Sequence, residues 1–309
     1  MQNVIPFNRE SFGQLLSKKF LLVIVISIPS AIVADFFKVP LAWMIGPMIA
    51  TSLIALKGFQ VIMPRLALSS ILIILGLHIG NYIDQNLLNQ MVNWIWTTII
   101  MFFYIVISIL IVSKYLQKFS DYKEKTSIFS AAPGALGPLM ILAEYEKSDL
   151  SQVATAHLIR LIIIITLFPF IIVSLYPAEA LELEKFDYMS QNHWELIILI
   201  IVSLVFIFFF DKFKVPAALL SGTLVASGVL QISDIASYKL PDASINFCLL
   251  ILGASVGCRF ANKTFKEVAN NSFHGLVATI LLVLLGLIAA YVCLLYTSDA
   301  ADEMVGVVV

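Results

Sequence analysis

The sequence predicts an all-α fold: a polytopic transmembrane bundle of about nine spans plus a re-entrant hairpin, built from an inverted internal repeat whose second copy is truncated. Three observations predict it. The 309 residues are 60% hydrophobic and only 13% charged, with a mean hydropathy of +0.97, which is typical of chains that have lipid as solvent. Several apolar runs approach the roughly 20 residues that cross a hydrocarbon core of about 30 Å. Glycines and prolines also recur in the same order in both halves of the chain.

Nine apolar runs are predicted to be spanning helices. They do not alternate apolar and polar residues as the strands of outer-membrane barrels do, so an α-helical bundle is preferred. The first run follows Lys18 and Lys19 and has no clear cleavage site, which favours a retained helix over a signal peptide. In chain order the runs are Phe20 to Phe37, Leu41 to Leu56, Leu66 to Ile83, Trp94 to Val112, Val153 to Tyr176, Leu196 to Phe210, Pro216 to Ile232, Ala243 to Cys258 and Phe273 to Tyr296.

The distribution of Lys and Arg predicts a multi-pass protein of the bacterial inner membrane with a cytoplasmic N-terminus. Short loops rich in these residues stay in the cytoplasm. With the N-terminus inside, the basic loops fall inside, whereas residues 84–93, which lack Lys and Arg, and the acidic residues 177–195 fall outside. This alternation holds only if residues 129–143 enter and leave on the cytoplasmic side, so we expect a re-entrant hairpin there.

The two halves of the chain share a pattern that indicates a gene duplication. Lys38-Val39-Pro40 recurs 176 positions later as Lys214-Val215-Pro216, and Ile74-Leu75-Gly76 recurs 177 positions later as Ile251-Leu252-Gly253. Five predicted crossings separate equivalent points, and an odd number inverts the second copy. The predicted divisions are a first repeat at 1–176, an extracytoplasmic linker at 177–193, a truncated second repeat at 194–296 and a poorly packed tail at 297–309, for which a foreign origin is one interpretation.

At the same offset, a second copy of the Pro-Gly segment at Pro133 is expected near position 310. Inverted repeats with Gly- or Pro-interrupted helices are the pattern of transporters, in which broken helices bind solutes near the middle of the bilayer. For the glycines of the two GxxxG motifs, Gly76, Gly80, Gly253 and Gly257, plain helix–helix contact is the alternative, because glycine lets two backbones approach closely. The positions concerned are Gly46, Pro47, Gly76, Gly80, Gly222, Gly253 and Gly257.

The segment from Ala131 to Pro138 is predicted to break a helix. Pro133 removes a hydrogen-bond donor, and Gly134 and Gly137 allow a positive φ. Such backbone is tolerated at membrane depth only where it is buried in protein or lines a cavity. We expect Leu139 to Tyr145 to form a half-helix whose positive N-terminal end points at a solute; a purely structural hairpin is the alternative.

His157 and Arg160 lie three residues apart and therefore share a helical face. A charge inside a membrane span marks a functional site, although a long Arg side chain can also reach the nearby surface. If Arg160 is functional, its guanidinium is expected to pair with Glu144 or to bind an anionic solute in bidentate fashion. His157 alone is more typical of a packed, hydrogen-bonded residue. The substrate-binding candidates are Pro133, Gly134, Gly137, Glu144, His157 and Arg160.

The sequence argues against an enzyme, a metal site and direct contact with nucleic acid. Cys248, Cys258 and Cys293 lack the spacing of zinc ligands and are interpreted as packing residues. The four histidines are scattered, so no metal, cofactor or catalytic residue is expected. No helix-turn-helix or basic region is visible. The expected partners are the lipid bilayer and a small anionic solute, and a homo-oligomer is left open.

With these motifs in hand, the chain resembles the AbrB membrane family over roughly Phe20 to Tyr296. The residues that carry the resemblance are Pro40 to Gly46 (PLAWMIG), Gly76 with Gly80, Ala132-Pro133-Gly134, and the stretch with Val153, Ala154, His157, Arg160 and Pro169. Ala135 stands where the family usually has a second glycine, and Pro138 where an acidic residue is expected, which puts a carboxylate role at that point in doubt. The resemblance implies a duplicated polytopic protein whose relatives are named for regulation of gene expression or for ammonia oxidation.

Two functions follow as expectations. The first is a permease, similar to secondary transporters, that holds a small solute between the two repeats. The second, which the family name alone suggests, is a membrane-bound regulator that controls gene expression indirectly, with residues 113–127 as its docking surface. Ammonia monooxygenase activity is a distant third, because a copper or iron oxygenase needs clustered ligands.

Overall fold

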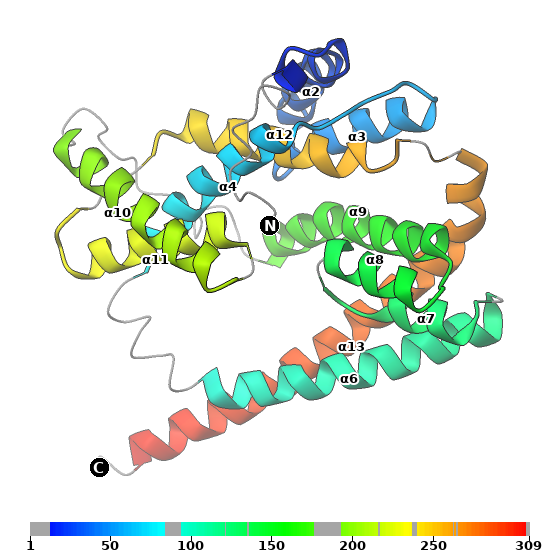
Figure 1. Ribbon diagram of the computed structural model, residues 1–309. Helices are drawn as coiled ribbons and strands as arrows, with labels where there is room; N and C mark the ends of the chain where they lie inside the picture. The colour runs from blue at the N-terminus through cyan, green and yellow to red at the C-terminus, as the bar shows by residue number, and fades with distance from the viewer. Residues whose placement is uncertain are drawn as a thin grey trace. The chain divides into compact units, whose positions relative to one another are not determined.

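The computed structural model describes residues 13–83, 94–120, 122–134, 136–175, 193–215, 217–236, 240–261, 263 and 265–306, and the regular structure in them is α-helical (Figure 1). The helices are α2 (Lys18–Phe36), α3 (Ala42–Leu56), α4 (Arg65–Gly80), α6 (Trp94–Phe119), α7 (Glu124–Ala131), α8 (Leu136–Tyr145), α9 (Leu150–Leu175), α10 (His193–Lys212), α11 (Ala218–Ile232), α12 (Asp242–Cys258) and α13 (Phe265–Gly306).

Each of the nine predicted spans falls on a helix, so the all-α prediction is confirmed. Helices α2, α6, α9, α10 and α13 are long and apolar enough to cross a membrane. Helices α3, α4, α11 and α12 are also apolar but have only 15, 16, 15 and 17 residues. At 1.5 Å per residue these four reach about 22–26 Å, which is less than the hydrocarbon thickness. The protein is therefore a helical membrane bundle that combines long apolar helices with shorter ones.

Two predicted spans are much shorter than the helices that contain them. Helix α13 begins at Phe265 and ends at Gly306, whereas the predicted span is Phe273 to Tyr296. Helix α6 does not end at Val112 but continues to Phe119, so Lys114 and Lys118 belong to a helix and not to a loop. The reason is that a lysine can extend its charge beyond the apolar layer, and a cation near a helix C-terminus is favoured by the helix dipole. The predicted outer loop at 84–93 and the acidic segment up to residue 192 lie outside the described residues.

Helices α2, α3, α4, α10, α11 and α12 lie in one compact unit, made of Met1–Asn89 and Ile165–Thr264. Helix α3 packs along α12, and α4 packs along α11; likewise α2 packs on α3, and α10 on α11. A two-fold relation between the copies requires this pairing of helices. If a residue of the first copy contacts a residue of the second, the two equivalent residues must make the same contact with the copies exchanged. The predicted repeats are thus not the compact units, because this unit contains helices of both.

The contacts of the glycines are equivalent in the two copies, residue by residue. Gly76 lies against Leu220, and Gly253 lies against Met44, which is 176 positions before Leu220. In the same way Gly80 lies against Ser227, and Gly257 lies against Thr51. A side-chain hydroxyl forms a hydrogen bond between the helices at each of these two contacts. Thr51 Oγ1 donates to the carbonyl of Ala254 at 3.4 Å, and Ser227 Oγ donates to the carbonyl of Leu77 at 2.9 Å. Equivalent residues therefore make equivalent contacts, as a duplication predicts.

The expected helix breaks at Gly46-Pro47 and at Gly222 do not occur. Helix α3 runs unbroken through Gly46 and Pro47, and α11 runs unbroken through Gly222. Instead, Gly46 packs against the backbone of Ser30 in α2, and Gly222 packs against that of Ile207 in α10. These glycines therefore serve close helix packing.

The chain is interrupted just before these two helices. Lys38 and Leu41 have φ values of 53° and 51°, and Lys214 and Ala217, 176 positions later, have 55° and 52°. A residue with a side chain seldom adopts this left-handed conformation, which costs roughly 1–2 kcal/mol. Its occurrence at two equivalent pairs of positions shows that both copies turn into their short helices in the same way.

A second compact unit consists of Gln90–Ile164 and Phe265–Val309. Within it α6 and α13 lie side by side (Figure 1). Thr97 contacts Cys293 at 3.2 Å near one end, and Tyr115 contacts His274 at 3.2 Å near the other, so the two helices are antiparallel. Helices α6 and α13 follow α4 and α12 in their respective copies, and equivalent helices of an inverted repeat run in opposite directions. The side chains from residue 295 onward lie outside the description, so poor packing of the tail stays a prediction.

Candidate functional site

A helical hairpin forms where the sequence predicts a break. Helix α7 ends at Ala131; Ala132 then turns to φ −59° and ψ 128°, and Gly134 has φ +154°. Helix α8 begins at Leu136, three residues before the predicted start, so Gly137 belongs to its first turn and not to the break. The first turn of a helix tolerates Pro138, because the backbone N–H groups there have no partner within the helix. Whether the hairpin re-enters the cytoplasmic side stays a prediction.

Two side chains from α9 bind the C-terminal end of α7. His157 Nε2 donates to the carbonyl of Phe129 at 3.0 Å. The guanidinium of Arg160 donates to the carbonyls of Ser130 at 2.5 Å, Ala131 at 3.3 Å and Ala132 at 3.1 Å. Both side chains are almost completely buried, at 4% and 8% exposure.

These contacts satisfy the last carbonyls of α7. A helix leaves its final carbonyls without intrahelical donors, and a buried carbonyl without a partner costs free energy. Here each carbonyl from Phe129 to Ala132 has a donor from α9. The positive guanidinium also faces the negative end of the α7 dipole. His157 and Arg160 therefore hold the hairpin in its bent form, and they can do so together because three residues separate them on one helix.

The hairpin rests on an apolar surface that we call the hairpin seat. The seat is formed by Val112 and Leu116 of α6 and by Ala278, Leu281 and Leu282 of α13, with Ala131 of α7 packed on it. Gln117 Nε2 donates to Ser127 Oγ at 2.8 Å at the edge of the seat. Both helices of an antiparallel pair thus support one hairpin.

Two contacts close the hairpin at the ends away from its bend. The amide N–H of Asp149 donates to Thr126 Oγ1 at 3.1 Å, and Lys125 forms an ion pair with Glu146. Tyr122 is buried between α6 and α7, and this burial, together with the nearby Asp149 carboxylate, raises its pKa to about 12. Its phenol therefore stays neutral at physiological pH.

The predicted ion pair between Glu144 and Arg160 does not form. Glu144 is exposed on α8, and Lys125 pairs instead with Glu146, two residues further on. The hydrogen bonds that the guanidinium of Arg160 makes all go to backbone carbonyls, and its Nε–H is buried without an acceptor. Within the described part of the chain, the charge of Arg160 consequently has dipoles around it but no carboxylate beside it. His157 is the packed, hydrogen-bonded histidine that its sequence context suggested.

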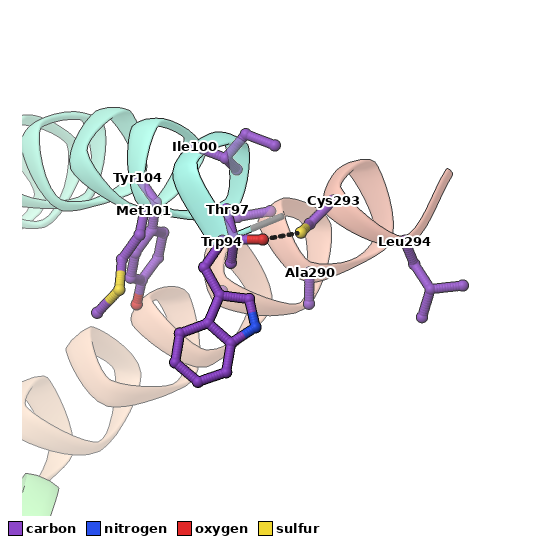
Figure 2. Close-up of a pocket in the computed structure, with 10 residues that line it drawn as sticks. Trp94, Thr97, Ile100, Met101, Tyr104, Ala290, Cys293 and Leu294 are labelled. Carbon is purple, nitrogen blue, oxygen red and sulfur yellow. Dashed lines mark hydrogen bonds between the residues drawn. The ribbon is translucent and has the colours of Figure 1, made fainter. Parts of the chain in front are cut away.

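A groove of about 610 Å³ lies between α6 and α13 at a distance along the pair from the hairpin. Figure 2 shows Trp94, Met101 and Tyr104 of α6 beside it, with Thr97 bonded to Cys293 of α13. The lining is completed by Ile100, Gly286, Ala289, Ala290 and Leu294. Sequence reasoning did not predict this groove. Within the part of the chain that the structure describes, no three His, Cys, Asp or Glu side chains come close enough to hold a metal ion.

Comparison with known proteins gives the family of the chain. The profile of the AbrB family, described as transition state regulatory protein AbrB, matches residues 10–304. The uncharacterized protein YhjN of Bacillus subtilis (strain 168) is 21% identical over 298 residues, a match that covers 88% of this chain and 76% of that protein. No solved structure matches. Because the family profile extends over nearly the whole sequence, the chain belongs to the AbrB family.

Proposed function

We propose that the protein is a permease for a small anionic solute, with the α7–α8 hairpin and Arg160 as the selective element. The observation that carries this proposal is the environment of Arg160. It lies ten residues into α9, or about 15 Å along the helix axis. It is buried and positively charged, and among the described residues no carboxylate pairs with it and one of its N–H groups has no acceptor. A charge at such depth in a spanning helix is costly and is retained where it acts on a substrate or an ion.

The hairpin supports the same proposal through its backbone. Residues 132–134 are not helical, and Pro133 and Gly134 are exposed although Ala131 is completely buried. Non-helical backbone at membrane depth needs protein or water around it, so an exposed bend indicates an aqueous path. An anion that reaches the bend meets the positive potential of Arg160 and the positive N-terminal end of α8. A carboxylate is the chemistry that this combination selects.

Uptake into proteoliposomes tests the proposal. Purified protein should accumulate at least one small carboxylate from a panel of acetate, lactate, succinate and glutamate, under an imposed proton or sodium gradient. Arg160→Lys keeps the charge but loses the planar guanidinium, so uptake should fall at least tenfold. Arg65→Lys, at the exposed start of α4, is the matched control and should leave uptake unchanged. No uptake of any solute, or equal uptake by both variants, would contradict the proposal.

The orientation in the membrane is tested separately by labelling single cysteines in intact cells. Cysteines placed at Asn86 and Glu182 should react with an impermeant maleimide from outside, whereas those at Lys118 and Lys263 should react only after permeabilisation. This pattern follows if the basic segments stay in the cytoplasm. Labelling of Glu182→Cys only from inside would mean that the hairpin region crosses the membrane, and the inverted topology would then be wrong.

A further inference from the structure

The groove between α6 and α13 is lined by residues that are equivalent, in the internal repeat, to residues of the hairpin seat. The offset of 177 that relates Gly80 to Gly257 can be continued into the next helices. It takes the seat residues Val112 and Leu116 to Ala289 and Cys293, and both of these line the groove. In the reverse direction it takes Ala278 and Leu281 to Met101 and Tyr104, which line the groove as well.

The directions of the two helices explain this agreement. A two-fold axis that exchanges two antiparallel neighbouring helices must stand perpendicular to the plane that contains them. Rotation about it exchanges the two ends of the pair but keeps each face on its own side. The hairpin covers one face near Tyr115 and His274. Its symmetry mate must cover the same face near Thr97 and Cys293, and the groove is found there.

The lining has the chemistry of a site for a helix. Three small residues, Gly286, Ala289 and Ala290, leave room for close approach of another backbone. A Cβ added at Gly286 would lie 3.4 Å from its nearest neighbouring atom, the hydroxyl oxygen of Tyr104. Gln117, which donates a hydrogen bond to Ser127 of α7 at the edge of the seat, corresponds to Leu294 in the groove. The occupant should therefore carry an apolar residue where α7 has Ser127.

We propose that the groove is the binding site of a second helical hairpin of the α7–α8 kind, because the internal repeat makes the groove the counterpart of the hairpin seat. With both hairpins in place, the α6–α13 pair carries one on each end of the same face. On the predicted topology the two hairpins enter the membrane from opposite sides. The proposal rests on the duplication and on the packing of α6 and α13, and it does not depend on transport.

Thiol–disulfide exchange with a peptide tests the proposal. The probe is a peptide of residues 120–147 with Ala131→Cys, whose thiol is activated with thionitrobenzoate. The protein is the full chain in detergent with Cys248→Ala and Cys258→Ala, so that Cys293 is its thiol. Because Ala131 and Leu116, the equivalent of Cys293, belong to one buried cluster, the peptide cysteine should come within reach of Cys293 and release thionitrobenzoate rapidly. The straight-helix control peptide carries Pro133→Ala and Gly134→Ala.

The matched protein control moves the thiol by two residues. In Tyr291→Cys with Cys293→Ala, the thiol lies at a position that is 65% exposed and does not line the groove. With the hairpin peptide, Cys293 should react at least tenfold faster than the thiol of this control, and the difference should vanish with the straight peptide or after Ala289→Phe. Equal rates at the two positions, or equal rates with the two peptides, would overturn the proposal. Cross-linking of two chains through Cys293 without peptide would assign the groove to a second copy and would also overturn it.

Discussion

Replacing Gly253 by alanine should lower the free energy of unfolding by about 3 kcal/mol, the upper end of the usual cost of overpacking. The added Cβ would lie 2.9 Å from the carbonyl carbon of Met44 and 3.0 Å from its Cα. These are backbone atoms of a neighbouring helix, so relief requires α3 and α12 to move apart. The measurement is thermal or denaturant-induced unfolding of purified protein in detergent.

Gly286→Ala is the matched control, because the nearest atom to its Cβ is the hydroxyl oxygen of Tyr104 at 3.4 Å, an ordinary contact. It should change stability by less than about 0.5 kcal/mol. Gly76→Ala, at the equivalent crossing, should also destabilise, since its Cβ would lie 2.5 Å from the carbonyl oxygen of Leu220. If Gly253→Ala were as stable as Gly286→Ala, the close packing of the two copies would be refuted.

Removing the side chain of Arg160 should open the hairpin. Arg160→Ala leaves the carbonyls of Ser130, Ala131 and Ala132 buried without donors, and this should cost about 3–5 kcal/mol. The local readout is maleimide labelling of Ser130→Cys, whose parent side chain is 1% exposed. Its labelling should be at least tenfold faster in the Arg160→Ala background.

Arg65→Ala is the control for loss of an arginine, and Arg160→Lys should fall between the wild type and Arg160→Ala because lysine retains charge and donors. A Ser130→Cys thiol that stays unreactive after Arg160→Ala would show that α7 does not need the α9 contacts. In that case the assignment of Arg160 as the residue that holds the hairpin would be wrong.

The positions of the helices and the duplication that relates them could be predicted, because both are visible in the order of residue types along the sequence. Hydropathy located nine apolar helices, five of them long enough to cross a membrane, and Pro133 with Gly134 located the bend. The offset between Gly76 and Gly253 predicted a duplication, and the structure places both at reciprocal crossings. These features depend on residue type alone, which is why sequence reasoning reached them.

The partners of Arg160 could not be predicted in the same way. Every residue has a carbonyl, so a guanidinium that binds backbone leaves no complementary residue type in the sequence. Glu144 looked suitable only because it is a nearby carboxylate, but on α8 it faces outward. The left-handed turns at Leu41 and Ala217 were missed for a related reason, since neither residue type favours that conformation. A short helix that ends in Ala-Pro-Gly, followed by His and Arg on one face, is the signal that could have suggested the contact.

The exchange of partners between copies has a consequence for biosynthesis. Helices α3 and α4 leave the ribosome long before α11 and α12 exist, yet these later helices supply their glycine-lined contacts. The first half of the nascent chain therefore lies in the bilayer without the helices that its glycine-lined faces contact in the folded protein. Contacts between residues so far apart in the sequence also make this stage of folding slow. Any ribosome that stalls before α12 is finished releases an insertion intermediate that quality-control proteases can recognise.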